Sequence, residues 1–334
     1  MKIVNYDPSY YDELWTYMHK HWPNRSKKYL DYRLFELSTA KEAAENLLVL
    51  NDNGKIVGTQ FVIPAKALIK GEERNIRFGC DTRVDEEYHG DGISLDLMLK
   101  TRKIKEGFAI GLSDVNKKIQ QKLKTRFIAK MSHYMILTKH CYKIGLFYLG
   151  VKTSKSVSDF KLPSEVTVGT TRFKQIFSSN ELKIPNNGYW SGEYFKLDFI
   201  RDDFFFRKHF FENFKGYSVY KLELGESITD ECYFVVRMTV DNGLARLLLI
   251  DYRYNVDKPI QLKMLLKAAS KIASRMRISV VQVSTSQNLL LHYPKPFILK
   301  RGVAVDVIAN SFFELNEAVD TIVTRADSDG DFID

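Results

Sequence analysis

Residues 75–105 read N-I-R-F-G-C-D-T-R-V-D-E-E-Y-H-G-D-G-I-S-L-D-L-M-L-K-T-R-K-I-K, and this stretch decides the fold. Residues 76–84 carry the apolar and β-branched side chains of a strand, which ends at three acidic residues. Gly90 and Gly92 then bracket Asp91, and an apolar helix pattern follows. Glycine lets backbone N–H groups approach an anion, and the helix dipole favours negative charge at that end. The order predicts a phosphate-binding loop, with an ordinary turn and helix cap as the alternative.

The rest of the first half supplies a consistent set of elements around this loop. Asn-Gly at residues 53–54, between two apolar runs, predicts a hairpin. The patterns predict the following elements: strands at 2–5, 47–50, 55–63 and 108–112, and helices at 8–20, 26–44, 93–106 and 117–124. A sheet of mostly antiparallel strands with flanking helices is therefore expected.

The segment V-D-E-E-Y-H-G-D-G-I-S resembles the acyl-CoA pyrophosphate loop of the GNAT superfamily of N-acyltransferases, whose pattern is Q/R-x-x-G-x-G/A. The two glycines match, whereas Glu87 stands where Gln or Arg is usual and His89 replaces a common Arg. The order of the predicted elements is also similar to that of the superfamily. The resemblance implies acyl-CoA as the acyl donor, bound through these residues: Val84, Tyr88, His89, Gly90, Asp91, Gly92, Ile93, Ser94 and Asn116.

The second half is similar in plan to the first. Residues 203–207, D-F-F-F-R, are similar to residues 29–33, Y-L-D-Y-R, and a second Asn-Gly hairpin lies at residues 233–250. We interpret the chain as an α/β (α+β) protein of tandem GNAT-like domains, 1–155 and 156–334, each a mixed, mostly antiparallel sheet flanked by helices. Two unrelated α+β domains are the alternative. Residues 251–259, where the second glycine loop is expected, contain no glycine, so we expect no second acyl-CoA site.

Two carboxylates are candidates for accepting the proton of an attacking amine. Asp81 lies on the strand before the loop, and Asp114 is expected at the end of the next strand. For each, a structural hydrogen bond to a nearby backbone group is the alternative. Cys80 is expected to face the opposite side of the strand from Asp81, because adjacent strand residues alternate. His133 is a weaker acid/base candidate.

Other chemistry is not indicated by the sequence. No metal-ligand spacing occurs, so we expect no metal. Where many members of the superfamily have a tyrosine that protonates the thiolate, this chain has Leu123, so no tyrosine acid is assigned.

Composition and charge restrict the setting. Three cysteines, an odd number, favour reduced thiols, and no signal peptide or run of eighteen apolar residues is seen. We therefore expect a cytoplasmic protein, monomeric or homo-oligomeric, with no membrane partner. The net charge of +9 fits a basic surface or a polyanionic ligand. No arginine-rich run or RNP-like strand points to nucleic acid, so none is expected as a partner.

The whole chain resembles bacterial N-acyltransferases that act on dTDP-linked amino dideoxy sugars for polysaccharide biosynthesis. This resemblance implies an acetyl or 3-hydroxyacyl transfer to the sugar amine, with the second half completing the acceptor site. Two alternatives remain open: a tandem-GNAT aminoacyl ligase of the peptidoglycan type, and a non-catalytic ligand-sensing protein. The acidic tail from Asp327 to Asp334 is expected to be solvated, or to contact a cationic group of the acceptor.

Overall fold

The computed structural model describes residues 1–102, 107–154, 156–182, 195–223, 232–310 and 321–327, with only the backbone at 102, 114 and 115. The chain forms two compact units, which we call unit 1 and unit 2. Unit 1 comprises residues 1–129, 305–319 and 328–334, and unit 2 comprises residues 130–304 and 320–327. The units differ from the predicted ranges 1–155 and 156–334, because residues 130–155 belong to unit 2 and residues 305–319 return to unit 1.

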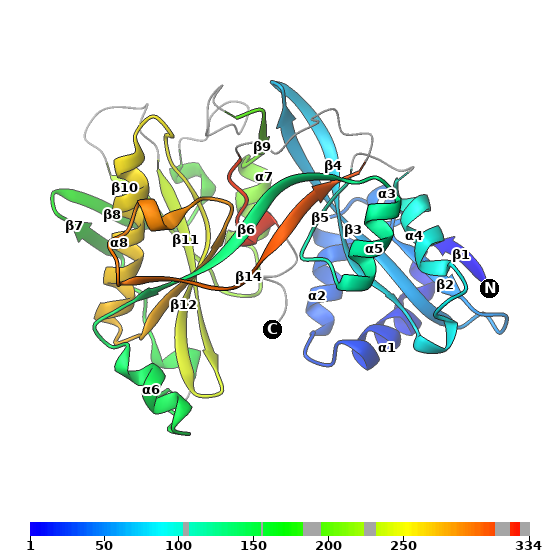
Figure 1. Cartoon of the computed structure of the whole chain (residues 1–334), viewed down its shortest axis with the longest axis horizontal. Coiled ribbons are helices and arrows are strands. Elements are labelled where there is room, and N and C mark those ends of the chain that lie inside the picture. The colour runs from blue at the N-terminus through cyan, green and yellow to red at the C-terminus, as the bar shows by residue number, and fades with distance from the viewer. Residues whose placement is uncertain (103–106, 155, 183–194, 224–231, 311–320, 328–334) are drawn as a thin grey trace. The chain divides into compact units, whose positions relative to one another are not determined.

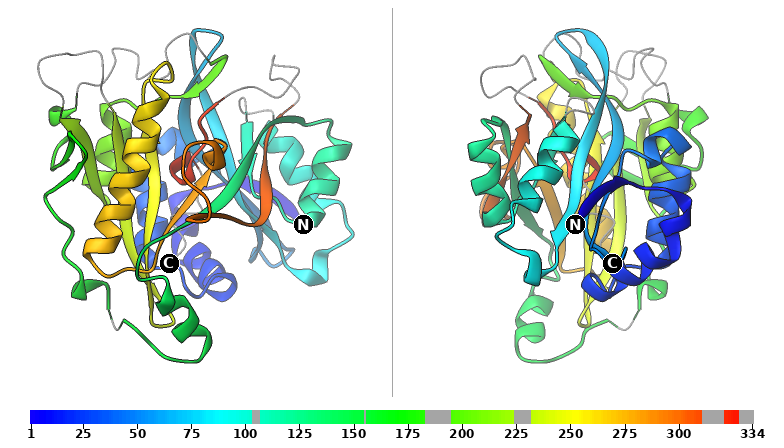
Figure 2. Two further views of the ribbon diagram at one scale, coloured as in Figure 1. Left: turned by 60° about the vertical axis from the view of Figure 1, so that its left-hand side comes forward. Right: turned by 90° about the vertical axis from the view of Figure 1, so that its right-hand side faces the viewer.

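Unit 1 is a mixed sheet with helices on both faces (Figure 1). Its strand order is β1-β2-β3-β4-β5-β14, and every neighbouring pair is antiparallel except β4 and β5. The strands are β1 (Lys2–Asn5), β2 (Leu47–Leu50), β3 (Ile56–Ile69), β4 (Glu72–Val84), β5 (Gly107–Ile110) and the end of β14 (Ile298–Ala309). The helices are α1 (Tyr11–His21), α2 (Lys27–Asp31), α3 (Ala40–Ala43), α4 (Ile93–Arg102) and α5 (Asp114–Lys122). Helices α1 and α2 lie on one face of this sheet, and α4 and α5 lie on the other (Figure 2).

Unit 2 is a second mixed sheet, in the order β6-β13-β12-β11-β10-β8-β7, with β12 and β13 as its parallel pair. Its strands are β6 (Arg126–Leu137), β7 (Glu165–Val168), β8 (Thr171–Ile176), β9 (Leu197–Phe199), β10 (Ser218–Glu223), β11 (Tyr233–Asp241), β12 (Leu244–Arg253) and β13 (Val280–Thr285). Its helices are α6 (Tyr142–Tyr148), α7 (Asp203–Phe206) and α8 (Pro259–Arg275). Helix α8 buries Leu262, Leu265 and Ile272 in the core of the unit. Among the described residues, no helix is long and apolar enough to span a membrane.

Three predicted elements differ from the structure. The expected helix 26–44 is broken, because a π-helix (Tyr32–Glu36) follows α2 and a capping box at Thr39 starts α3 anew. Strand β3 continues through Pro64 to Ile69 instead of ending before the proline. Strand β12 continues to Arg253 and α8 begins at Pro259, so the predicted loop 251–259 is shortened to residues 254–258. The connection that remains still contains no glycine.

A buried ion-pair cluster joins helix and sheet in unit 1. Arg25 stands just before Ser26, the N-cap of α2, and its guanidinium lies 4.8 Å from the ring centroid of Tyr29. The same guanidinium lies 2.5 Å from Oδ1 of Asp81 on β4. Arg33 and Tyr29 both donate hydrogen bonds to Oδ2 of Asp81. The helix and the strand are thus connected through one buried carboxylate.

Unit 2 contains the same arrangement. Arg201 stands just before the N-cap of α7, and its guanidinium lies 4.1 Å from the ring centroid of Phe205. Arg201 pairs with Asp251 on β12 at 2.9 Å, and α7 also runs into a π-helix. Both aspartates begin a D-x-R sequence on the second strand of a hairpin that carries a β-bulge. These repeated features support the expected duplication.

We expect Asp251 to make the stability of unit 2 dependent on acid pH. Burial raises the pKa of this fully buried carboxyl, but the attraction of Arg201 and Arg253 outweighs it and lowers the pKa to about 2. Because the unfolded carboxyl takes up a proton first, the stabilisation is fully present above about pH 4 and is lost as the pH falls toward 2.

The free energy of unfolding should be compared between the wild type and Asp251→Asn by urea titration. Their difference should shrink by about 1 kcal/mol between pH 6 and pH 3. A difference that is constant over this range contradicts the assignment.

Candidate functional site

The glycine loop connects β4 to α4 through a short 3-10 turn (Glu86–Tyr88). Gly90 has a φ of +103° and Gly92 a φ of +78°, conformations that other L-residues rarely adopt. A Cβ at either position meets no atom within 4 Å, so the backbone conformation, and not crowding, requires glycine. The carbonyl of Gly92 accepts hydrogen bonds from the amides of Leu95 and Asp96. Helix α4 therefore begins directly after Gly92.

The loop presents a row of backbone amides. The amides of Gly90 and of residues 92–94 donate to no carbonyl of the described chain, and the first amides of a helix have no intrahelical acceptor. His89 Nε2 donates to the carbonyl of Val84 at 2.9 Å, which closes the loop against its strand. Amides aligned at a helix N-terminus bind phosphate groups, because the N–H groups and the dipole act together.

The side chains of the loop hold it in place. Val84 and Ile93 are buried in an apolar cluster against which Tyr88 packs. They therefore anchor the two ends of the loop, and only their backbone remains for a ligand. Asp85 lies 3.2 Å from the ammonium of Lys20, whereas Glu87 is exposed. With an exposed acid at the loop, phosphate binding here depends on the backbone amides.

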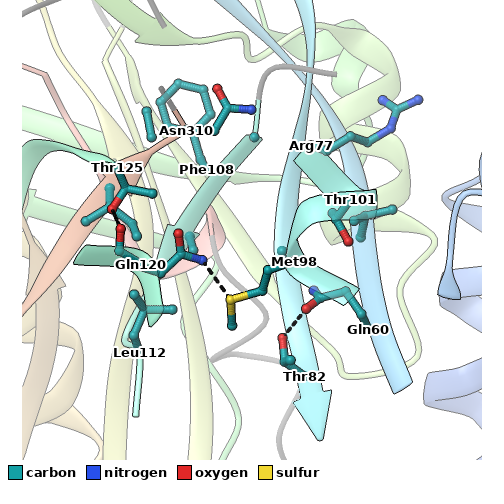
Figure 3. Close-up of a pocket in the computed structure, with 16 residues that line it drawn as sticks. Gln60, Arg77, Thr82, Met98, Thr101, Phe108, Leu112, Gln120, Thr125 and Asn310 are labelled. Carbon is teal, nitrogen blue, oxygen red and sulfur yellow. Dashed lines mark hydrogen bonds between the residues drawn. The ribbon is translucent and has the colours of Figure 1, made fainter. Parts of the chain in front are cut away.

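Beyond the loop, β4 and β5 diverge. They pair with each other only at Arg77 with Gly107 and at Phe78 with Phe108, after which β4 stays paired with β3 and β5 with β14. A cavity of about 70 Å³ opens at this divergence, between the sheet and the helices α4 and α5 (Figure 3). It is smaller than pockets that enclose whole ligands, which measure about 300–1,000 Å³. Only the end of a longer ligand fits inside it.

The walls of the cavity combine apolar and polar side chains. Gln120 of α5 donates to Sδ of Met98 of α4 at 3.4 Å, and Thr82 donates to Gln60 on the sheet side (Figure 3). Asn116 lies one turn before Gln120, so it shares the face of α5 that is directed at α4. The predicted ligand residue Asn116 and the cavity therefore belong to the same side of unit 1.

Asp81 is surrounded by cationic and phenolic groups. Arg25 occupies one carboxylate oxygen, Arg33 and Tyr29 occupy the other, and the side chain is 2% exposed. Neither oxygen is open to an amine in this arrangement, which favours a structural role. The role of Asp81 in proton transfer stays a prediction.

The predicted separation of Cys80 from Asp81 is wrong. Arg33 contacts both side chains, through Cys80 Sγ and through the Asp81 carboxylate. The cause is a β-bulge: β3 and β4 shift register between Thr59 and Phe61, and Asp81 has a φ of +48°. The bulge interrupts the alternation of side chains on which the prediction depended.

The other two candidates for proton transfer, Asp114 and His133, lie away from the Asp81 cluster. Asp114 is the first residue of α5, not the end of a strand as predicted, and its side chain lies outside the described part of the chain. His133 lies in unit 2, where Nδ1 is 2.8 Å from Ser284 Oγ. Burial, and then the charge of Arg325, lowers the pKa of His133. The described residues contain no group of His, Cys, Asp and Glu side chains that could hold a metal ion.

The sequence reasoning missed the residues that line the cavity, above all Thr82, Met98 and Gln120. The i, i+4 spacing of Asn116 and Gln120 was an available signal for a common helix face. The acidic tail from Asp327 to Asp334 was expected to be solvated or to contact the acceptor, but its first residue, Asp327, is buried and pairs with Arg201 at 2.6 Å. Residues 328–334 lie outside the described residues.

Comparisons with known proteins identify the fold. No family model and no curated protein sequence matches the chain. Among solved structures, a GCN5-related N-acetyltransferase from Anabaena variabilis is similar with a TM-score of 0.58 and 12% identity, over 92% of this chain and 72% of that one. Saccharomyces cerevisiae N-myristoyltransferase with bound myristoyl-CoA is similar with a TM-score of 0.59 and 11% identity, over 92% of this chain and 82% of that one. A probable N-acyltransferase from Enterococcus faecalis is similar with a TM-score of 0.57 and 12% identity, over 92% of this chain and 71% of that one. The predicted GNAT-type fold is confirmed.

Proposed function

We propose that the protein transfers an acyl group from acyl-CoA to an amine, with the pyrophosphate bound by the amides of Gly90 and of residues 92–94. The observation that carries this proposal is the row of unpaired amides at the start of α4, with a cavity in the same unit where β4 and β5 diverge. The likeness to N-myristoyltransferase with bound myristoyl-CoA supports the choice of donor.

The reaction needs no covalent enzyme intermediate. The neutral amine nitrogen attacks the thioester carbonyl, the new C–N bond forms, and the C–S bond breaks. The nitrogen then gives its second proton to the departing CoA thiolate, so the products are the amide and the CoA thiol. One ammonium proton must leave before the attack. We propose Asp114 as its acceptor, because α5 begins there, two residues after Leu112, which lines the cavity. Asp81 holds the bulge of β4 in place from the opposite side.

For the acceptor we propose the amine of a dTDP-linked amino dideoxy sugar. An amine flanked by sugar hydroxyls should titrate near an α-amine, at about 8, so part of it is neutral at physiological pH. The net charge of +9 suits two polyanionic substrates. A weak base is then sufficient.

The test is a mass-spectrometric screen of acetyl-CoA and 3-hydroxyacyl-CoA against dTDP-amino sugars. An acylated sugar together with free CoA supports the proposal. Transfer only from aminoacyl-tRNA would favour the peptidoglycan-type ligase. CoA binding without any transfer would favour the ligand-sensing alternative.

We expect Gly79→Ala to shift the choice of acyl chain. Gly79 lines the cavity, and an added Cβ would lie 3.5 Å from Gln60 Nε2 and 3.8 Å from the carbonyl of Phe108, which is ordinary contact. The methyl group should therefore occupy cavity space without straining the fold. A pocket that loses room for one methylene discriminates by about tenfold or more.

The measurement is kcat/KM for acetyl-CoA and for a 3-hydroxyacyl-CoA. The value of kcat/KM should fall about tenfold for the 3-hydroxyacyl-CoA and much less for acetyl-CoA. Gly145→Ala, in α6 of unit 2 with no atom within 4 Å, is the matched control. Equal losses for the two donors would place the acyl chain elsewhere.

A further inference from the structure

Helix α6 of unit 2 exposes Tyr142 and Tyr148 at its two ends, and Leu149 and Val151 are exposed just after it. None of its residues is buried, and the segment from Tyr142 to Val151 exposes large aromatic and aliphatic groups. Tyr148 is 70% exposed and Leu149 is 79% exposed. Figures 1 and 2 show α6 at the outer end of unit 2, near the turn between β11 and β12. Contiguous exposed apolar surface of this kind marks an interaction site.

Polar bonds hold this segment at both ends. At its start, Lys143 Nζ donates to the carbonyl of Arg277 at 2.8 Å. After the helix, the amides of Thr153 and Ser154 both donate to the carbonyl of Gly243 at 2.9 Å. The helix is therefore fixed in position by its ends, while its apolar side chains stay available to a partner.

The charge around α6 has one sign. In the part of unit 2 from Lys130 to Ser158 the sequence contains five lysines and no Asp or Glu. Lys139 and Lys152 flank α6 and are exposed. The acidic residue closest along the neighbouring hairpin turn, Asp241, pairs with Arg246 at 3.2 Å. A partner for this surface must accept apolar groups and carry negative charge.

We propose that the segment 139–152 docks onto an anionic lipid surface. Tyrosines, leucines and flanking lysines are the side chains that insert into, and are attracted to, the headgroup region of such a membrane. A second copy of the chain fits poorly, because pairing this surface with itself would bring like charges together. The sequence led us to expect no membrane partner, and the exposure of α6 is what changes that expectation.

The test is vesicle flotation of the full chain. Binding is expected to vesicles of phosphatidylcholine with about 30% phosphatidylserine, and much less to phosphatidylcholine alone. The double variant Tyr148→Ser, Leu149→Ser should reduce binding at least about tenfold. The matched control is Phe177→Ser, Leu291→Ser, whose side chains in unit 2 are 72% and 77% exposed. All four side chains are at the surface, so both variants should keep the wild-type melting temperature.

The charge is tested separately. Lys139→Gln, Lys152→Gln should weaken binding and reduce its dependence on salt. The control is Lys258→Gln, Lys263→Gln, at exposed lysines beside the N-terminus of α8, the opposite end from Arg277, which contacts Lys143; it should bind like the wild type. Equal binding by the α6 variant and its control would overturn the proposal, as would equal binding to neutral vesicles. A wild-type dimer in sedimentation that Leu149→Ser dissociates would assign the surface to a second copy instead.

Discussion

Gly92→Val should abolish acyl-CoA binding while the protein stays folded. A β-branched residue cannot adopt the φ of +78° without strain, so the backbone of the loop must change and its amides lose their alignment. The Cβ would also project into open space beside these amides, where the phosphates are expected. We expect the dissociation constant of CoA to rise at least about 100-fold, since losing charge-assisted hydrogen bonds costs about 1.5–3 kcal/mol each. Gly90→Val should act in the same way.

The control for this variant is Gly54→Val. Gly54 lies in the turn between β2 and β3 of the same unit, with a φ of +76° and no atom within 4 Å of an added Cβ. It therefore carries nearly the same backbone strain away from the loop. If both variants lose stability equally and only Gly92→Val loses CoA, the loop is the binding site. CoA affinity unchanged in a folded Gly92→Val protein would refute the assignment.

Asp81→Asn should cost about 3–5 kcal/mol of the free energy of unfolding. The substitution leaves the guanidiniums of Arg25 and Arg33, which are 4% and 3% exposed, without their carboxylate. A buried cation that loses its partner is strongly destabilising. Because a domain is stable by only about 5–15 kcal/mol, urea should unfold this variant at a much lower concentration than the wild type.

Asp52→Asn serves as the comparison. Asp52 pairs with the N-terminal amine at 2.8 Å, but its side chain is 91% exposed, so its loss should leave the free energy of unfolding nearly unchanged. If Asp81→Asn were as stable as the wild type and lost kcat only at low pH, Asp81 would be the proton acceptor after all.

The sequence predicted most strands and the glycine loop because both depend on local signals. Asn-Gly turns and the period-2 pattern placed β2, β3, β11 and β12, and the paired glycines placed the start of α4. Such signals reside in a few adjacent residues. The position of Asp114 at the start of α5 could have been recognised from Ser113, which caps that helix.

The environment of Asp81 could not be predicted in this way. It depends on a β-bulge and on two arginines that lie 56 and 48 residues earlier in the chain. The same holds for the cavity, whose walls come from α4, α5 and the strands β3, β4, β5 and β14. Likewise, the periodicity of α6 says nothing about whether another element covers it.

The central claim is that one acyl-CoA binds per chain, at the glycine loop of unit 1. Isothermal titration of the full-length protein with CoA tests it most directly, because the two units repeat the same plan but only one has a glycine loop. We predict a single class of sites with a stoichiometry of one, absent in Gly92→Val. Binding of two CoA molecules per chain, or undiminished binding by Gly92→Val, would contradict the account.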